Sequence, residues 1–270
     1  MQTSEITYRA GKRTLLEDIS ISISPGEVTA IIGPNAAGKS TFLKLLAGDM
    51  KPTSGSISLN GIELADWTPQ SLSLFRSVMP QASTLTFPFT AKEVVGLGRL
   101  PHQKGESSKL TNDIVLEVLE WSGTRHLADR LYTTLSGGEK QRIDFARAIS
   151  QVWQPVNKCS RYLLLDEPTS SLDLSRQHET LQRICAFAQD NVATIVVLHD
   201  LNLAAHYADR ILVLSDGCSA GWGSPKDVLT SDLIGSTFGL SVIVSEHPQY
   251  LGPLIIPNPN PIPERVNNYP

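Results

Sequence analysis

Apolar residues occur along this chain of 270 residues as short continuous runs separated by polar turns. Runs of strand length without polar alternation predict strands that are buried on both faces. Asn60-Gly61 and Asp216-Gly217 each follow such a run, and both pairs predict hairpins. The predicted strands are Leu15 to Ile23, Val28 to Ile32, Ser56 to Leu59, Tyr162 to Leu165, Ala193 to Leu198 and Ile211 to Leu214.

Helical periodicity replaces the strand signals in the middle of the chain. Residues 82 to 155 are therefore expected to form a helical insert between two parts of one core, residues 1 to 81 and 156 to 245. Residues 246 to 270 form a proline-rich tail, expected from Pro253 onward to be extended or disordered with little to bury. The predicted helices are Ser40 to Ala47, Thr90 to Gly98, Asn112 to Ser122 and a stretch through Ile143 to Ile149.

One glycine-rich segment lies between a predicted strand and a predicted helix. It reads Gly33-Pro34-Asn35-Ala36-Ala37-Gly38-Lys39-Ser40-Thr41 and fits the phosphate-binding pattern G-x-x-x-x-G-K-[S/T]. Its glycines let the backbone wrap closely enough to aim N–H groups at phosphates, and the N-terminus of the following helix adds a positive end. Lys39 would reach the outer phosphates and Ser40 would supply a hydroxyl to Mg²⁺. The sequence therefore predicts a site for ATP and Mg²⁺.

A second acidic site follows the run Leu163-Leu164-Leu165. Asp166 and Glu167 stand at its carboxyl end, where ligands collect in open parallel sheets. Asp166 is the candidate carboxylate for Mg²⁺. Glu167 is the candidate base that polarises the water attacking the γ-phosphate, a role that contributes about 10² to 10⁴ in rate. An isolated pair of acids would more often simply cap a strand, but the phosphate loop upstream favours the catalytic interpretation.

A third motif, Leu135-Ser136-Gly137-Gly138-Glu139-Lys140-Gln141-Arg142, opens a predicted helix. Its helix N-terminus preceded by glycines is a second anion site. One nucleotide needs only one phosphate loop, so the second site is expected to contact the γ-phosphate bound by another copy of the chain. Ser136 and Glu139 also fit a capping box, and a cap does not exclude phosphate contact.

These motifs, together with Gln81, Ser171-Leu172-Asp173 and His199, occur in the order and spacing of ABC-type ATPase subunits. The chain resembles that family over roughly residues 3 to 245. The resemblance implies an α/β fold with a mixed sheet core, an antiparallel β subdomain and an α-helical subdomain.

The same resemblance implies roles for single residues. Two copies would face head to tail as a homodimer, with each phosphate loop opposite Ser136, Gly137 and Gly138 of the other. Gln81 would contact Mg²⁺, and His199 would contact the γ-phosphate and the attacking water. Asp173 would order the facing catalytic site.

Two positions depart from the family pattern. Position 36 is Ala where glycine is usual, and a methyl at a backbone position with φ > 0 costs on the order of 1 kcal/mol. Family members usually stack the adenine on an aromatic residue of the first strand, a place that falls on Ala10 here. Tyr8, two residues away, is the candidate replacement, with packing on the sheet as the alternative.

Further motifs resemble those of importers for iron–siderophore complexes, haem and vitamin B₁₂. They are Thr86-Phe87-Pro88-Phe89-Thr90 and Leu198-His199-Asp200-Leu201-Asn202-Leu203-Ala204. Extra residues between Ala148 and Tyr162 resemble the haemin-import ATPases. The resemblance implies partnership with two permease subunits and, indirectly, a periplasmic haem-binding protein. A siderophore or B₁₂ importer and a soluble ABC ATPase remain alternatives.

Charge and cysteine content narrow the partners and the compartment. The chain has 23 basic and 27 acidic residues without a block of like charge, so nucleic acid is not the expected partner. Its three cysteines are odd in number and widely spaced, which argues for a reducing compartment. No run approaches the ~20 apolar residues of a membrane span. The expected location is peripheral, on the cytoplasmic face of a bacterial inner membrane.

Overall fold

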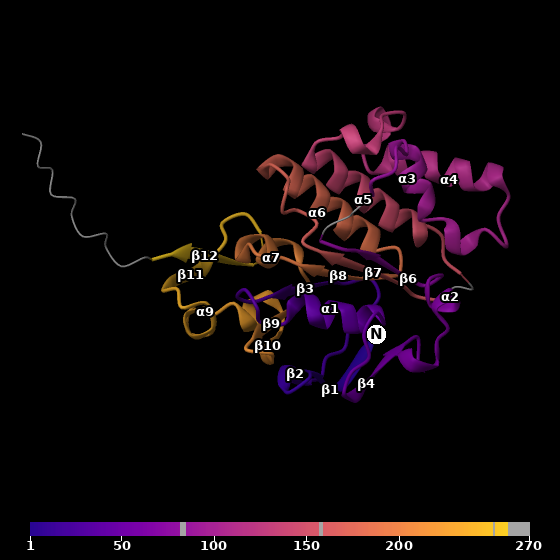
Figure 1. Cartoon of the computed structure of the whole chain (residues 1–270). Coiled ribbons are helices and arrows are strands. Elements are labelled where there is room, and N and C mark those ends of the chain that lie inside the picture. The colour runs from indigo at the N-terminus through magenta and orange to yellow at the C-terminus, as the bar shows by residue number, and fades with distance from the viewer. Residues whose placement is uncertain (82–84, 157–158, 251, 259–270) are drawn as a thin grey trace, which may run out of the picture.

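The computed structural model describes residues 1–81, 85–156, 159–250 and 252–258. A six-stranded sheet crosses its centre in the order β10-β9-β3-β8-β7-β6 (Figure 1). Strands β6 to β9 and β3 are parallel, and only β10 runs antiparallel to its neighbour. The strands are β3 (Val28–Ile32), β6 (Arg76–Met79), β7 (Arg161–Asp166), β8 (Val192–Val197), β9 (Arg210–Ser215) and β10 (Cys218–Gly223).

Every residue of β3, β7 and β8 is buried, because both faces of this sheet are covered. Alternate side chains enter two separate apolar cores: Leu163 and Leu165 belong to one, and Tyr162 and Leu164 to the other. Helix α1 (Lys39–Ala47) covers the second face, and α5 (Gly137–Gln151), α6 (Leu174–Ala188) and α7 (Leu201–Tyr207) cover the first (Figure 1). The carboxyl ends of β3, β7 and β8 therefore remain open for a site.

A four-stranded antiparallel sheet packs beside α1 in the order β2-β1-β4-β5. Its strands are β1 (Gln2–Ala10), β2 (Arg13–Ile19), β4 (Ser54–Leu59) and β5 (Ile62–Glu63). The predicted hairpin after Leu59 is present, with Asn60 and Gly61 at φ 52° and 78°. The hairpin from β9 to β10 is likewise confirmed.

The helical part of the chain begins at α3 (Ala91–Leu97), which Thr90 and Glu93 cap reciprocally. Helix α4 (Ser108–Trp121) follows and packs with α3 and α5 in one apolar core. Shorter helices are α2 (Pro69–Leu72), α8 (Pro225–Val228) and α9 (Ser231–Phe238), with 3₁₀ turns at Leu64–Asp66, Leu100–His102, Arg125–Leu127 and Tyr132–Thr134. None of the helices in the described ranges has the length and apolar character that a bilayer crossing requires.

The structure corrects two expectations about strands. Strand β6, which had no counterpart among the predicted strands, forms the edge of the central sheet. Strand β2 ends at Ile19 rather than Ile23, and beyond it only Ser22 makes an isolated bridge. A short edge strand with polar positions and a strand that leaves its sheet early carry no clear apolar pattern.

The tail expectation is wrong for residues 253–257. Strand β12 (Pro253–Pro257) pairs with β11 (Val242–Glu246), and Ile255 is buried against the main core. The side chain of Asn202 accepts a hydrogen bond from the Ile255 N–H at 2.8 Å and donates one to its C=O at 3.0 Å. This stretch is extended, as expected, but it is paired and partly buried. The tail from residue 259 onward lies outside the described residues.

Candidate functional site

The phosphate loop connects β3 to α1, and its backbone excludes side chains at two positions. A Cβ on Gly33 would lie 2.2 Å from the Leu214 carbonyl oxygen, and one on Gly38 would lie 2.6 Å from Leu16 Cδ2. Both glycines also have positive φ, 153° and 100°. The fold therefore requires glycine here, and Gly38 forms the N-cap of α1 without a capping side chain, which leaves the first helical N–H groups directed outward.

Lys39 turns back over the loop that precedes it. Its ammonium donates hydrogen bonds to the carbonyl oxygens of Gly33 and Pro34, both at 2.8 Å, and the side chain is buried. Burial lowers the pKa of Lys39, and the nearby carboxylates of Glu167 and Asp166 oppose that shift. The cation is therefore held at the mouth of the loop by neutral acceptors that an anionic ligand can replace.

A cavity of about 340 Å³ opens over this loop. Glu167 and His199 join the loop residues in its wall, so the structure brings the loop together with groups more than 120 residues away in sequence. Two residues of β2 complete the wall, Arg13 and Leu15, and sequence reasoning missed both. The loop residues in the wall are Asn35, Ala36, Gly38, Lys39, Ser40 and Thr41.

Asp166 is the last residue of β7 and is only 7% exposed. Burial raises the pKa of its carboxyl, and a hydrogen bond from the Ser40 hydroxyl opposes that rise. Its Oδ1 is buried without a hydrogen-bond partner among the described residues. A buried carboxylate oxygen without a donor, next to a hydroxyl, is a donor set that suits a hard cation such as Mg²⁺.

Glu167 follows directly and has a left-handed backbone with φ 53°. One of its carboxylate oxygens accepts a hydrogen bond from Gln81 Nε2 at 2.9 Å, and the other lies 2.6 Å from His199 Nε2. Gln81, Glu167 and His199 follow β6, β7 and β8, three neighbouring parallel strands. The carboxyl ends of these strands thus converge on one carboxylate.

Gln141 of α5 supports this strand end, and no role was predicted for it. Its side-chain amide donates to the Glu167 carbonyl at 2.8 Å and accepts from the Ser171 N–H at 3.0 Å. Gln141 is 8% exposed. A polar residue on the buried face of an amphipathic helix was the one signal in the sequence that could have identified it.

The Ser136-Gly137-Gly138 turn is not part of the cavity wall. Ser136 caps α5 by accepting from the Glu139 N–H at 3.3 Å, and Glu139 accepts in return from the Ser136 N–H at 2.8 Å. The capping-box prediction is therefore confirmed. Ser136 and Gly137 are exposed, and a Cβ on Gly137 would meet no atom of the described residues within 4 Å. The fold alone does not explain glycine at position 137.

Three further predicted residues occupy clear positions. Ala36 has φ 65°, so the methyl does sit in a left-handed conformation. Tyr8 pairs with Leu16 across β1 and β2 and packs on the apolar core beside α1, which is the alternative of the two expectations for it. Tyr8 is not among the residues of the cavity wall. Asp173 caps α6 by accepting from the Arg176 N–H at 2.9 Å, and Leu174 beside it is 69% exposed.

Known proteins match the chain in both sequence and fold. The hemin import ATP-binding protein HmuV of Gloeobacter violaceus is 49% identical over 257 residues, which cover 95% of this chain and 94% of that protein. The HmuV of Myxococcus xanthus is 44% identical over 247 residues, covering 92% of each. A dimeric ATP-binding cassette solved in a post-hydrolysis state with ADP and Pi superposes with a TM-score of 0.70 at 26% identity, covering 83% of this chain and 97% of that one.

The matched segment covers most of the site. Residues 16–170 fit the ABC transporter family, a span that begins in β2 and includes the phosphate loop, the Ser136 turn and the Asp166-Glu167 strand end. The relatives extend the match over almost the whole chain. A phosphate loop facing a clamped carboxylate, within a sequence related throughout to ATP-binding subunits, shows that this chain belongs to the ABC transporter family of ATPases.

Proposed function

We propose that this chain is the ATP-hydrolysing subunit of a bacterial importer for haemin. The observation that carries the catalytic part is the carboxylate of Glu167, held between Gln81 and His199 on the wall of the cavity above the phosphate loop. A carboxylate at that place can accept a proton from a water that attacks the terminal phosphate. The relatives named as hemin import proteins support the choice of solute.

The phosphate loop acts by positioning and by charge. Its backbone N–H groups and the N-terminus of α1 face the cavity, and Lys39 can turn from the Gly33 and Pro34 carbonyls to the β- and γ-phosphates. The negative charge that develops on the transferring phosphoryl group then meets a preorganised cation and a set of fixed dipoles. Gly33 through Thr41 are assigned to nucleotide binding on this basis.

Mg²⁺ fits the residues that face Ser40. We assign Ser40, Asp166 and Gln81 as the residues that would hold it, because the Asp166 Oδ1 is buried without a donor beside the Ser40 hydroxyl. The ion supplies neutralisation of the phosphate oxygens when it is bound. Coordination would offset the cost of burying the Asp166 charge.

Glu167 and His199 have separate roles in the attack of water on the γ-phosphate. Glu167 orients the water and takes its proton, while His199, 48% exposed at the cavity wall, can turn its imidazole toward the γ-phosphate. Gln81, which donates to a Glu167 oxygen, would instead hold the cation when the cation is bound. The backbone of Glu167 stays in place during this exchange because Gln141 holds its carbonyl.

The second helix N-terminus completes the site from another copy. Ser136, Gly137 and Gly138 are on the surface, outside the cavity of their own chain. In a head-to-tail homodimer they would cover the γ-phosphate bound by the partner, so that two ATP molecules are enclosed. The dimeric cassette with ADP and Pi supports a dimer of such chains. Glycine at 137 is explained by close approach of a ligand from outside the chain.

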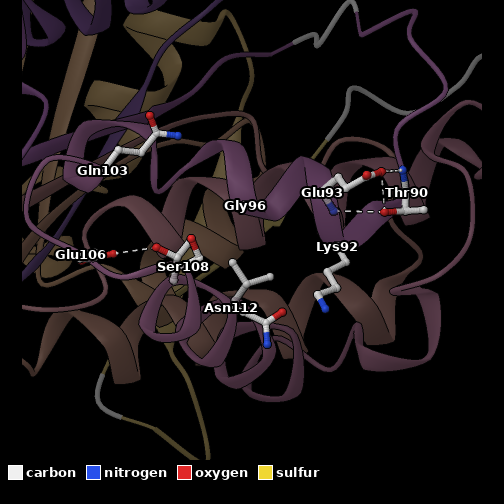
Figure 2. Close-up of a pocket in the computed structure, with 10 residues that line it drawn as sticks. Thr90, Lys92, Glu93, Gly96, Gln103, Glu106, Ser108 and Asn112 are labelled. Carbon is white, nitrogen blue, oxygen red and sulfur yellow. Dashed lines mark hydrogen bonds between the residues drawn. The ribbon is translucent and has the colours of Figure 1, made fainter.

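A second cavity, about 630 Å³ in volume, lies between α3 and α4 and is the proposed contact with a permease subunit. Figure 2 shows Lys92 and Glu93 of α3 on one side of it and Ser108 and Asn112 of α4 on the other. Val115 and Gly96 also line it. A helical segment of a membrane partner, polar at its edges, matches that surface.

The Phe87-Pro88-Phe89 segment lies at the entrance to α3. Phe89 packs against the main core, whereas Phe87 is 69% exposed. An exposed aromatic ring three residues before Thr90, which lines the cavity, supports a permease contact for Phe87. ATP-driven closure would move this surface and with it the permease, because Gln81 precedes it in the chain and contacts Glu167.

The solute itself need not touch this chain. Two permease subunits and a periplasmic haem-binding protein would handle haemin, while this subunit lies peripherally on the cytoplasmic face of the inner membrane. The described residues include no helix that could span a bilayer, so attachment would come through the permease.

The decisive experiment measures ATP hydrolysis by this chain in complex with its co-purified permease. Addition of a haemin-loaded periplasmic binding protein should stimulate hydrolysis, and Glu167→Gln should abolish it. Phe87→Ala should lose stimulation but keep basal hydrolysis, with Ile62→Ala, an exposed apolar residue of β5, as the control. Stimulation only by a siderophore- or cobalamin-loaded protein would keep the importer and replace the solute. Failure to recover any membrane protein would contradict the importer.

A further inference from the structure

The last turn of α5 is bonded to the segment that joins α3 to α4. The Arg99 guanidinium, only 1% exposed, donates to the Ser150 carbonyl at 2.5 Å and forms an ion pair with Glu106. Beside it, His102 Nε2 donates to the Gln151 carbonyl at 2.7 Å. These donors satisfy carbonyls that the helix itself leaves without partners at its C-terminus. The end of α5 is therefore fixed to this joining segment.

Glu106 also belongs to the cavity proposed as the permease contact. It lines that cavity together with Glu93 of α3 and Asn112 of α4 (Figure 2). Its Oε2 accepts hydrogen bonds from Arg99 Nε and from the Thr111 hydroxyl, each at 3.3 Å. Because Arg99 is bonded to both Glu106 and α5, a movement of this cavity wall would move the last turn of α5 as well.

The Gln151 side chain connects the same turn to the edge of the central sheet. Its Nε2 donates to the carbonyls of Ser73 and Arg76 at 2.8 and 2.9 Å. Its Oε1 accepts from the hydroxyl of Ser77, which lies in β6 beside Arg76, at 3.2 Å. A side-chain amide can donate and accept at the same time, which neither a carboxylate nor an apolar chain can do. Gln151 thus binds the cavity side through its backbone and the sheet through its side chain.

Strand β6 leads to the carboxylate of the nucleotide site. It ends at Met79, and Gln81 follows two residues later and donates to Glu167 at 2.9 Å. The strand also pairs with β7 along its whole length, from Arg76 to Met79. That pairing holds β6 in the sheet independently of Gln151. Loss of the Gln151 side chain should therefore break the connection to the helical part and leave the nucleotide site in place.

We propose that Gln151 is a positioning residue that transmits movement of the permease-facing cavity through β6 to Gln81 and Glu167. The inference rests on the proposed function, since it names the connection by which the permease would regulate hydrolysis. Hydrogen-bond networks and rigid elements carry coupling between distant sites. Gln151 lines neither the nucleotide cavity nor the permease-facing one, so it acts on the response of hydrolysis to the permease and not on either binding step.

The test measures ATP hydrolysis by the complex with its co-purified permease, with and without the loaded binding protein that stimulates the wild type. Gln151→Met keeps the length of the side chain but loses its three hydrogen bonds. It should lower the stimulation by about fivefold or more, as expected for loss of a coupling between sites. Basal hydrolysis and the Kd for ATP should stay at wild-type values. Gln154→Ala, an exposed glutamine beyond the end of α5, is the control.

Two further variants separate coupling from a purely structural role. Ser77→Ala removes one of the three hydrogen bonds, and it should cause a smaller loss of stimulation at wild-type basal hydrolysis. This milder variant tests the proposal even where Gln151→Met does not fold. In a Gln81→Ala background, Gln151→Met should cause no additional loss of stimulation, because both residues act through the same connection.

Each alternative has its own result. Equal losses of basal and stimulated hydrolysis would show that Gln151 only supports the fold of the site, and would overturn the proposal. Wild-type stimulation in Gln151→Met and Ser77→Ala, or a further loss in the Gln81→Ala background, would overturn it too. Loss of the co-purified permease would make Gln151 part of the docking surface and reject the coupling role. A wild-type complex that no loaded protein stimulates would instead overturn the proposed function.

Discussion

Two glycine-containing turns lie at the N-termini of helices, the phosphate loop at α1 and the Ser136-Gly137-Gly138 turn at α5. They differ in what requires the glycine. In the phosphate loop, a Cβ on Gly33 would meet a backbone oxygen at 2.2 Å, so the fold itself excludes any side chain. In the Ser136-Gly137-Gly138 turn, a Cβ on Gly137 would point into open space as far as the described residues extend. The first turn is complete within one chain, whereas we propose that Gly137 in the second serves as a surface for another molecule. Substitutions at the two turns should therefore separate folding from function.

The largest expected effect concerns the rate of ATP hydrolysis and comes from Glu167, in the cavity over the phosphate loop. Glu167→Gln should lower hydrolysis by about 10² to 10⁴, since the amide accepts no proton from water, and should retain ATP binding. Single-turnover hydrolysis and equilibrium ATP binding measure the two quantities. Glu179→Gln, a carboxylate on α6 that pairs with Arg176 away from the cavity, is the matched control. Wild-type turnover in Glu167→Gln would remove Glu167 from the mechanism.

Gly33→Ala tests the steric requirement of the phosphate loop. The methyl must displace the Leu214 carbonyl or the loop, at a cost of about 2 to 4 kcal/mol in unfolding free energy, and ATP binding should be lost. Chemical denaturation and nucleotide titration report the two effects. A variant with wild-type stability would show that the loop can relax away from β9.

Gly137→Ala should have the opposite signature. Alanine suits the first turn of α5 better than glycine does, so the free energy of unfolding should stay equal or rise by up to about 1 kcal/mol. Hydrolysis at saturating ATP should nevertheless fall, on the order of tenfold, because the methyl lies where the partner's phosphate is expected. Reduced stability together with normal hydrolysis would refute the division between the two turns.

Asp166→Asn examines a buried charge that serves the site and not the fold. Burial raises the pKa of the Asp166 carboxyl in the folded protein above its ordinary value of 3.8. The folded state therefore binds a proton more tightly than the unfolded state, and wild-type stability falls as pH rises from 3.8 through the raised pKa. Without nucleotide, Asp166→Asn should have the higher Tm at neutral pH, and the difference should vanish towards pH 3.8. A difference that grows on acidification would reverse the sign and refute this account.

The smallest effect concerns Ala36. Its φ of 65° is left-handed, so Ala36→Gly relieves backbone strain in the folded state. The same substitution raises the conformational entropy of the unfolded chain, which opposes that gain. We expect a net gain of at most about 1 kcal/mol in unfolding free energy, and slightly tighter ATP binding. Thermal denaturation with and without nucleotide measures both. Ala37→Gly, at a buried position without positive φ, should destabilise instead and is the control.

Local sequence patterns predicted most of the central sheet and the parts of the site that each lie on one segment. Apolar runs identified β3, β7 and β8 because these strands are buried on both faces. Strand β6 was missed because Arg76–Met79 is short, carries polar residues and lies at an edge. Strand β12 was missed because its prolines suggested a free tail, while its pairing with β11 and the Asn202 hydrogen bonds were not visible locally.

The sequence by itself determined the chemistry of each segment: a phosphate loop, an acidic strand end and a capped glycine turn. These depend on backbone geometry and residue type over fewer than ten positions, which a local pattern records. Only the tertiary structure decided that Gln81 and His199 clamp Glu167, that Tyr8 faces the core and that Arg13 lines the cavity. Those facts follow from strand order and from a bulge in β2, because neighbours in a sheet are chosen by packing over the whole chain.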